Sequence, residues 1–382
     1  MPYFDNAATT KPLLSDMELL KMDGIWGNPS SRYYVGLKSR EAIDACRDSI
    51  KLAFDAKSGD VIFTSGGTES NNLALLGVVN YLKQQNKDAI ITSCIEHPSV
   101  KNVMKKLEFM GFEVIYMGVD YRGKVSIEDL EQQMDLLGNR LGLVSIQMVN
   151  SEIGTKQDLE SIGALCHKRG VLFHTDAVQG VGRYRISIDD CYIDMLSMSG
   201  HKIHALKGIG ALYVRDKTLL TPIVQGGGQQ YGLRSGTENV SGILSMKNSV
   251  DKVLLNPTIG VIEKMMRDGF TKKLEEAMEI PYFINNKECT NGIVSITIPK
   301  VEGTALMLLL DGEEFYVSTG SACSSNSLEA SYVLRSIGLD EKSAFCTIRV
   351  SIDSSENSQD DCTRLAKVIA LKSKELYDIG QG

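Results

Sequence analysis

The sequence predicts an α/β protein with a large domain built on a mostly parallel sheet, followed by a smaller α+β domain. Short apolar runs alternate with helical segments from about residue 61 to residue 214, the pattern of a parallel sheet covered by helices on both faces. From about residue 282 the order of elements changes and this alternation ends. With 382 residues and 43% hydrophobic side chains, the chain is long enough for two cores.

Hydrophobic spacing and apolar runs predict the individual elements. In the large domain, strands are expected at residues 61–64, 89–93, 113–117, 141–149, 171–175, 194–197 and 211–214. Helices are expected there at residues 42–54, 71–83, 100–110, 127–137 and 159–168, and the helical stretch 240–277 is expected to contain a loop at 256–257. In the small domain, strands are expected at 292–298, 315–318 and 347–352, and helices at 303–310, 331–337 and 359–377. The expected large domain spans residues 15–255, and the small domain takes residues 1–14 and 256–382.

Polar side chains follow many of the expected strands. In open parallel sheets, ligands bind at the carboxyl ends of the strands, so this clustering predicts a binding site at that edge. The residues concerned are Thr68, His97, Asn150, Ser151, Asp176, Gln179, Ser199, His201 and Lys202.

Residues 65–70, Ser-Gly-Gly-Thr-Glu-Ser, lie between an expected strand and an expected helix. Gly66 and Gly67 allow a close backbone approach, and Thr68 adds a hydroxyl donor beside the free N–H groups of a helix start. This is the geometry of a phosphate site, although a tight strand-to-helix turn would use the same glycines. The glycine spacing is not that of a P-loop.

Residues 197–202, Ser-Met-Ser-Gly-His-Lys, are expected to form a short polar loop that presents Lys202. A lysine amine can form a Schiff base with an aldehyde cofactor, and Ser199 and His201 can donate hydrogen bonds to a phosphate. From this stretch alone, a solvated surface lysine is an equal alternative.

Charge and cysteine usage exclude several classes of protein. The net charge is −7 and no Lys/Arg-rich run is present, so direct nucleic-acid binding through a basic patch is not expected. The N-terminus has no signal-peptide pattern and no apolar run is long enough to span a bilayer, so we expect a cytoplasmic protein that makes no membrane contact. The eight cysteines are scattered without a C-x-x-C pair, so neither a disulfide framework nor a metal site is expected.

Ten short stretches, taken in chain order, make the sequence resemble the NifS/IscS-type cysteine desulfurases. These enzymes use pyridoxal 5'-phosphate (PLP), belong to the class-V aminotransferase family and have fold type I, the fold of aspartate aminotransferase. The resemblance covers nearly the whole chain. The stretches are residues 5–10, 27–31, 64–72, 96–98, 150–154, 174–179, 197–202, 226–239, 318–329 and 348–351.

The resemblance implies roles around the cofactor ring. Lys202 would hold PLP covalently and later move protons. Asp176 would pair with the pyridinium nitrogen, which keeps the ring able to accept electrons. His97 would stack on the ring and act as an acid or base, and Gln179 would bond the phenolate oxygen.

The resemblance also implies how the phosphate and the substrate, L-cysteine, would be held. Arg349 would bind the substrate carboxylate through its bidentate fork, and Asn150 would contact the substrate. A homodimer is implied, because the partner subunit's Thr237 would reach the phosphate. The remaining cofactor contacts would come from Gly67, Thr68, Ser151, Ser199 and His201.

Cys323 is the implied nucleophile. It lies in residues 321–325, Ser-Ala-Cys-Ser-Ser, a small-residue loop with nothing apolar to anchor it, where a thiol is expected to be mobile and accessible. Its thiolate would attack the sulfur of the bound cysteine, giving alanine and a persulfide for a sulfur-acceptor protein. A buried structural thiol is the alternative at this position, and it is our interpretation of the other cysteines.

Three departures from the family pattern touch loops near the expected site. Ser151 stands where a second asparagine is usual, and Tyr33 stands where histidine is common. After Lys202, the usual aromatic residue, Gly and Pro are replaced by His204, Ala205 and Leu206, which implies a different local backbone path.

Two other functional hypotheses stay open at this point. Another fold type I enzyme, such as an aminotransferase or a selenocysteine lyase, would share the PLP site, but transamination needs no thiol like Cys323. An inactive scaffold for sulfur-acceptor proteins would have no need of Lys202, Asp176 or His97. The sequence does not name the acceptor, so iron–sulfur cluster assembly, tRNA thiolation and other sulfur incorporation are all compatible with it.

Overall fold

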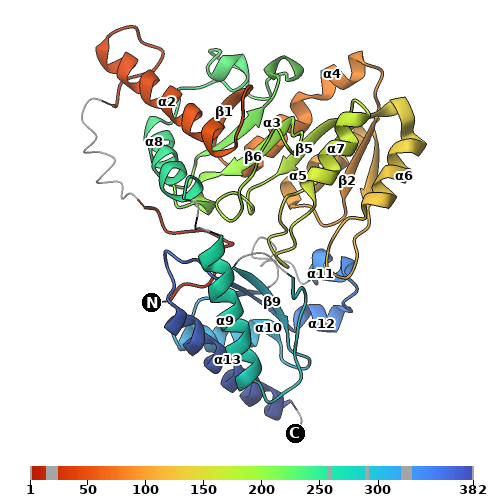
Figure 1. Cartoon of the computed structure of the whole chain (residues 1–382), viewed down its shortest axis with the longest axis vertical. Helices are drawn as coiled ribbons and strands as arrows, with labels where there is room; N and C mark the ends of the chain where they lie inside the picture. Colours follow the sequence, from red (N-terminus) through yellow and green to blue (C-terminus); the bar gives the residue numbers. More distant parts are fainter. Residues whose placement is uncertain are drawn as a thin grey trace.

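The computed structural model describes residues 2–13, 25–256, 258, 260–288, 292–319 and 329–380. These residues form two sheets with their own helices (Figure 1), a seven-stranded sheet and a four-stranded sheet. The four-stranded sheet and its helices occupy the lower part of the view, below the larger sheet.

The larger sheet has the strand order β1-β7-β6-β5-β4-β2-β3. Its strands run parallel except for β7, which pairs antiparallel with both β1 and β6. Most of its strands are buried along their length, which explains their nearly unbroken apolar sequences. The bounds are β1 Asp60–Thr64, β2 Ala89–Ser93, β3 Glu113–Met117, β4 Leu141–Ser145, β5 Leu172–Asp176, β6 Met195–Ser199 and β7 Gly210–Val214.

Helices cover both faces of the larger sheet, and each face has its own hydrophobic core. On one face the core includes residues of α3 Gly67–Gly77, α4 Val79–Gln84 and α5 Pro98–Phe109. On the other it includes residues of α2 Tyr34–Ala53, α6 Ile127–Leu137, α7 Leu159–Lys168 and α8 Val240–Ser249. Single 3₁₀ turns lie at Gly138–Arg140, Gly200–Lys202, Lys217–Leu219 and Gln230–Gly232, and a π-helical turn at Val250–Leu254.

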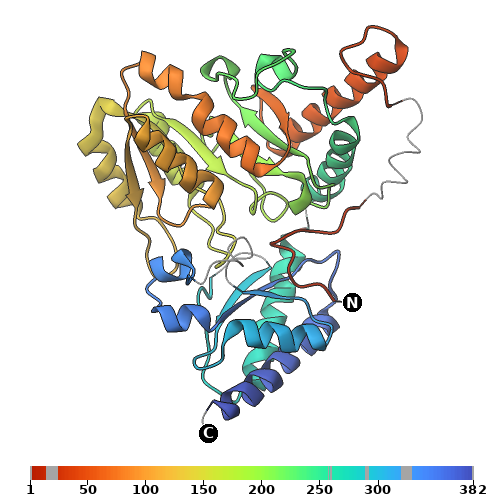
Figure 2. The same cartoon turned by 180° about the vertical axis from the view of Figure 1, so that it is seen from behind.

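The smaller sheet is antiparallel, in the order β10-β11-β9-β8. Helices pack against it (Figure 2), and Phe270 and Ile348 are among the buried residues of its core. A separate small cluster joins Val333 and Leu334 to Ile95 and Ile153 of the larger part. The bounds are β8 Phe283–Ile284, β9 Ile293–Thr297, β10 Ser318–Thr319, β11 Thr347–Ser351, α9 Val261–Ala277, α10 Gly303–Gly312, α11 Tyr332–Ser336, α12 Glu341–Phe345 and α13 Gln359–Ile379.

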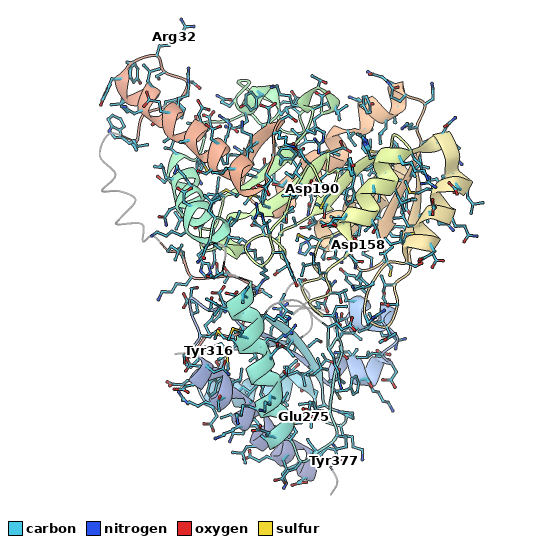
Figure 3. All side chains as sticks on the ribbon, viewed as in Figure 1. Arg32, Asp158, Asp190, Glu275, Tyr316 and Tyr377 are labelled. Carbon is cyan, nitrogen blue, oxygen red and sulfur yellow. The ribbon has the colours of Figure 1, made fainter. Side chains whose placement is uncertain are left out.

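Residues 2–13 form an arm that joins the two parts. Phe4 is buried in the core of the smaller sheet, and Ala7 is buried in the core of the larger one. Tyr3 forms a β-bridge with Tyr316, which is labelled in Figure 3. Farther along the arm, the Thr10 N–H donates to the carbonyl of His201 at 2.9 Å. The arm is therefore hydrogen-bonded to both parts of the molecule.

Most of the expected elements are found in order, with several differences in bounds, including α2, which begins at Tyr34 rather than near residue 42. The helix expected at 71–83 starts earlier, at Gly67, because the small polar residues of its first turn carry no hydrophobic period. It is also divided into two helices, α3 and α4. The strand expected at 141–149 ends at Ser145, although the next residues are also buried. The short helix α12 and the two-residue strand β8 were not expected, because both are too short to show a period. The strand expected at 315–318 is displaced, since β10 covers only Ser318–Thr319.

Within the described residues, no helix is both long and apolar enough to cross a membrane.

The first prediction concerns Gly210, where β7 passes the turn before α3. A Cβ on Gly210 would lie 2.5 Å from the Gly66 Cα and 2.8 Å from the Met198 carbonyl oxygen. Because both neighbours are backbone atoms, we expect Gly210→Ala to lower the free energy of unfolding by about 1–3 kcal/mol in urea titrations. Gly118→Ala is the matched control, since a Cβ there meets nothing within 4 Å. Equal unfolding midpoints for the two variants would contradict this packing.

Candidate active site

A cavity of about 340 Å³ lies at the carboxyl ends of the central strands of the larger sheet. The arm and residues of the smaller part complete its wall. All nine strand-end residues expected from the sequence line it, and so does Arg349 of β11. The lining residues of most interest are Ala7, Ala8, Gly67, Thr68, Asn71, His97, Ser99, Asn150, Ser151, Glu152, Asp176, Gln179, Ser199, His201, Lys202 and Arg349.

A larger cavity of about 710 Å³ lies beside the arm and is lined in part by Tyr3, Lys207 and Tyr316. Of the described residues that line it, none belongs to the strand-end set. The smaller cavity is therefore the better candidate for an active site, because convergent polar groups distinguish such sites more clearly than size does.

The start of α3 forms an anion-binding corner of the cavity. Among the described residues, no side chain caps this helix at Gly66, so its first N–H groups are available to a ligand. A Cβ at Gly67 would lie 2.6 Å from Val178 Cγ2, so only glycine fits there. Ser199 borders the same corner, because its Cβ would lie 3.5 Å from a Cβ placed on Gly67.

His201 stands on the wall of the cavity, next to Lys202. Its Nδ1 is 3.1 Å from the Thr9 hydroxyl. Burial, followed by the charges of Lys202 and Lys207, lowers the pKa of His201 to about 4. At neutral pH the ring is therefore uncharged, and it can act as a hydrogen-bond donor without adding a cation.

Asp176, the last residue of β5, is buried with both carboxylate oxygens occupied. Its Oδ1 accepts the N–H of Val178 at 3.0 Å, and its Oδ2 accepts the amide of Asn71 at 2.7 Å. The strand end and the first turns of α3 thus fix the direction of this carboxylate.

His97 is linked to Asp176 through two side chains. The Asn71 Nδ2 group that binds Asp176 also donates to the Ser99 hydroxyl at 2.9 Å. This hydroxyl lies 2.8 Å from Nδ1 of His97, which also accepts the N–H of Ser99 at 3.1 Å. Because Nδ1 accepts a hydrogen bond, the proton of a neutral His97 ring is on Nε2.

Lys202 lies in the single turn after β6, and the arm holds its amine. Nζ donates to the carbonyl oxygens of Ala7 and Ala8 at 2.5 and 2.7 Å. The Gln179 side-chain amide donates to the same Ala7 carbonyl at 2.8 Å. The expectation of a loop that presents this lysine is met, although the lysine is not a solvated surface side chain.

Arg349 enters the cavity from the smaller sheet and is 3% exposed. Its Nη2 donates to Asp5 at 2.6 Å, and its Nη1 donates to the Ser151 carbonyl at 3.0 Å. Within the described part of the chain, the buried Nε has no hydrogen-bond partner. One donor of the fork is therefore left for an acceptor that these residues do not supply.

Two buried carboxyl groups were not expected from the sequence. Burial is the largest influence on both, and it raises the pKa of Glu152 to about 7 and that of Glu96 to about 8. Glu152 accepts the hydroxyl of Ser331, just before α11, and Glu96 accepts the N–H of Gln147 at 2.9 Å. Glu152 also lines the cavity, so a carboxyl that titrates near neutral pH faces the site.

Two expected site residues stand apart from the rest. Thr237 is exposed and is not among the described residues that line this cavity, and its expected contact is with the phosphate in the partner subunit. Asn150 lines it, but its side chain accepts the N–H groups of Glu152 and Ile153 and donates to the Ile95 carbonyl. Its visible role is therefore to shape its own loop.

Cys323 and Cys289 lie outside the described residues. Four other cysteines, Cys46, Cys166, Cys191 and Cys362, are buried, and Cys94 and Cys346 are half-buried.

Three residues of the site were missed, namely Asn71, Ser99 and Glu152. Each lies in or directly beside a stretch that the sequence analysis singled out, one helical turn or less from a named residue. That proximity was the available signal, but their hydrogen-bond partners come from other segments and cannot be found from spacing.

Comparisons with known proteins agree with this geometry. The family model described as "Aminotransferase class-V" matches residues 2–365. A curated relative from Dictyoglomus turgidum, "Cysteine desulfurase IscS", is 40% identical over 358 residues, covering 92% of this chain and 89% of the relative. Two solved structures are similar: a "NIFS-LIKE PROTEIN" at 30% identity and TM-score 0.84, covering 99% of both chains, and "SspA in complex with cysteine" at 33% identity and TM-score 0.80, covering 92% of this chain and 99% of the other. This chain therefore belongs to the class-V aminotransferase family, among its NifS/IscS-type cysteine desulfurases.

Proposed function

We propose that the chain is a cysteine desulfurase, which removes sulfur from L-cysteine, releases L-alanine and leaves a persulfide on Cys323. The observation that supports this best is the convergence of Lys202, Asp176 and Arg349 on one cavity. The amine of Lys202 can react with the aldehyde of PLP, and the carboxylate of Asp176 can pair with its ring nitrogen. The guanidinium of Arg349 can bind the carboxylate of an amino acid substrate.

The cavity fits PLP as the resident cofactor. The uncapped start of α3, the Gly67 backbone and the Ser199 hydroxyl form a cradle for its phosphate, with Thr68 and neutral His201 as further donors. Asp176 would hold the ring nitrogen, Gln179 the phenolate oxygen, and His97 would cover the ring. When bound, PLP supplies an electron sink that stabilises negative charge on the substrate carbons.

Arg349 would bind the substrate carboxylate. Its buried Nε–H lacks a partner among the described residues, and a carboxylate would supply the missing acceptor. The Asp5 contact and the Ser151 carbonyl already orient the guanidinium, so it would have little freedom to lose on binding.

Lys202 and Glu152 are the groups best placed to move protons. Lys202 Nζ is held by two carbonyl oxygens of the arm, which fixes where it can take up or release a proton. Glu152 has its pKa raised to about 7 by burial, so its carboxyl can hold or release a proton at neutral pH.

Cys323 would perform the sulfur transfer. Its thiolate attacks the sulfur of the bound cysteine, so that an S–S bond forms and the C–S bond breaks. The electron pair of the broken bond goes to the substrate carbon, which takes up a proton and leaves as alanine. Cysteine and the Cys323 thiol thus give alanine and a Cys323 persulfide, with no external oxidant or reductant.

We propose that the functional groups are divided between two domains. Residues 15–255 would carry the cofactor groups, whereas residues 1–14 and 256–382 would carry Arg349 and the Cys323 segment. The enzyme would act in the cytoplasm as a homodimer, with the partner subunit's Thr237 at the phosphate. A sulfur-acceptor protein, in iron–sulfur cluster assembly or in tRNA thiolation, would receive the persulfide sulfur.

Lys202→Ala tests the cofactor attachment. We expect borohydride treatment of the wild-type enzyme, followed by peptide mass spectrometry, to find the pyridoxyl group on Lys202. The variant should show no such adduct, and sulfide release should fall by about 10³-fold or more. An adduct on another lysine of the wild type would overturn this assignment.

Asn71→Ala tests the link between Asp176 and His97. The variant removes the amide that both Asp176 and Ser99 accept, so kcat/KM for cysteine should fall about tenfold, as for a lost hydrogen bond to a charged group. Asn71→Asp should be worse, because it places a second carboxylate against Asp176.

The matched control for Asn71 is Asn72→Ala, whose side chain donates to the Thr68 carbonyl within the same helix. It should keep near-normal kinetics, and PLP should bind in all three variants by equilibrium dialysis. Equal losses at the two asparagines would show that only helix stability matters.

Cys323→Ser separates a desulfurase from other PLP enzymes, since a serine hydroxyl is a far weaker nucleophile toward sulfur than a thiolate. The variant should fold, bind PLP and release almost no sulfide in the presence of reductant. In the wild type, mass spectrometry after brief exposure to cysteine should place the added sulfur on Cys323. Cys94→Ser and Cys346→Ser should stay active. Wild-type sulfide release from Cys323→Ser would favour a lyase that needs no thiol nucleophile, whereas consumption of cysteine without sulfide release by the wild type would favour an aminotransferase.

A further inference from the structure

We propose that His204 is a positioning residue, a doubly protonated imidazolium that fixes the Lys202 turn against the strand carrying Arg349. The proposal rests on the function proposed above for its catalytic consequence, but the charge state of His204 follows from the structure alone. It also gives a role to one of the three departures from the family pattern.

His204 is two residues beyond Lys202 and is 4% exposed. Its φ of +67° is a conformation that residues other than glycine rarely adopt, so the surrounding contacts must stabilise it. One such contact is made by its backbone N–H, which donates to the Thr10 hydroxyl at 2.7 Å. The Leu13 N–H in turn donates to the His204 carbonyl at 2.9 Å.

Both ring nitrogens of His204 face oxygen acceptors. Nδ1 is 2.9 Å from the Lys11 carbonyl oxygen, and Nε2 is 3.1 Å from Asp353 Oδ2. A carbonyl and a carboxylate can only accept, so each nitrogen must carry a proton. The Ser355 hydroxyl is 3.3 Å from Nε2, but it lies only 2.6 Å from Asp353 Oδ1 and donates there.

The charged groups around the ring favour the same state. Burial alone would lower the pKa of His204, but the hydrogen bond and charge of Asp353 outweigh it, and the Lys11 carbonyl and Glu356 add to the rise. Burial alone would raise the pKa of Asp353, yet His204, Ser355 and the charge of Arg183 bring it well below its usual range. The two groups therefore form a buried ion pair.

This ion pair connects the segments that carry the two ends of the proposed substrate site. Asp353 follows β11, the strand of Arg349, and the Asn6 amide donates to the Ser351 carbonyl at the end of that strand. On the other side, His204 belongs to the turn of Lys202. The distance between the groups proposed for the amino and carboxylate ends of the substrate therefore depends on this contact.

The charge of His204 has a defined pH window. Because its pKa is raised above the ordinary 6.5, its contribution is complete below about pH 6.5 and is lost as the pH rises through the raised value. At low pH the pair is lost only when Asp353 takes up a proton. Because the pKa of Asp353 is lowered, this happens below pH 3.8, the ordinary pKa of an aspartate.

Nuclear magnetic resonance of the full-length, PLP-loaded enzyme with ¹⁵N-labelled histidine tests the charge state directly. The His204 signals are identified by their loss in His204→Gln. We expect both ring nitrogens to be protonated at pH 7, and the Asp353→Asn variant to lose one of these protons at lower pH than the wild type does. A singly protonated His204 at pH 7 would overturn the proposal.

Steady-state kinetics between about pH 6 and pH 9.5 test the positioning role. The ratio of wild-type to His204→Gln kcat/KM cancels ionisations that both enzymes share. It should be about tenfold at neutral pH, mostly through KM for cysteine, and should shrink as His204 of the wild type loses its proton. Asp353→Asn should behave alike, and the double variant should be no worse than either single one.

His167→Gln is the matched control, because this ring stacks on Tyr192 at a centroid distance of 4.4 Å, next to a different cavity. Its kinetics should equal those of the wild type at every pH. A loss in His204→Gln that does not change with pH would show a merely structural role. A wild-type enzyme that releases no sulfide would refute the proposed function, while the magnetic resonance titration would still decide the charge state of His204.

Discussion

The arm formed by residues 2–13 is the constraint on which the rest of the site depends. Three cationic side chains in or next to the site each take an oxygen partner from it. The Ala7 and Ala8 carbonyls accept the amine of Lys202, Asp5 accepts the guanidinium of Arg349, and the Lys11 carbonyl accepts the ring of His204. Since a buried cation without partners costs several kcal/mol, Arg349 and His204 can stay buried, and Lys202 half-buried, only when the arm lies in place.

The carboxyl groups in and beside the site differ from one another in what surrounds them. Asp176 accepts from Val178 and from Asn71 of α3, without any contribution from the arm. Among the described residues, neither Glu96 nor Glu152 accepts a hydrogen bond from a cationic side chain, and burial raises the pKa of both. Asp353, which does pair with a cation, has its pKa lowered although it too is buried. At these sites the partner, rather than burial alone, determines the direction of the shift.

Most of the sheet and much of the cavity could be predicted from the sequence, for a topological reason. Parallel strands end at one edge, so polar residues that directly follow apolar runs are brought together whatever their separation in the chain, as with His97, Asp176 and Lys202. The contacts of Asn71 and Ser99 could not be predicted, because they join α3, α5 and the end of β5, which are far apart in the sequence. Likewise, nothing in the local sequence pairs His204 with Asp353.

The arm also explains why the two sheets act as one unit around the cavity. Phe4 is buried in the smaller core and Ala7 in the larger one, so the segment between them spans the junction within a few residues. The side chains that take partners from this segment come from both sides, Arg349 from β11 and Lys202 from the turn after β6. Any relative movement of the two sheets would have to break charge-assisted hydrogen bonds in a buried environment, where water could not replace them at once. Backbone carbonyls and one aspartate of a short N-terminal segment thus help to fix the geometry between the amine and the guanidinium, together with the His204–Asp353 ion pair and the small apolar cluster that joins the two parts.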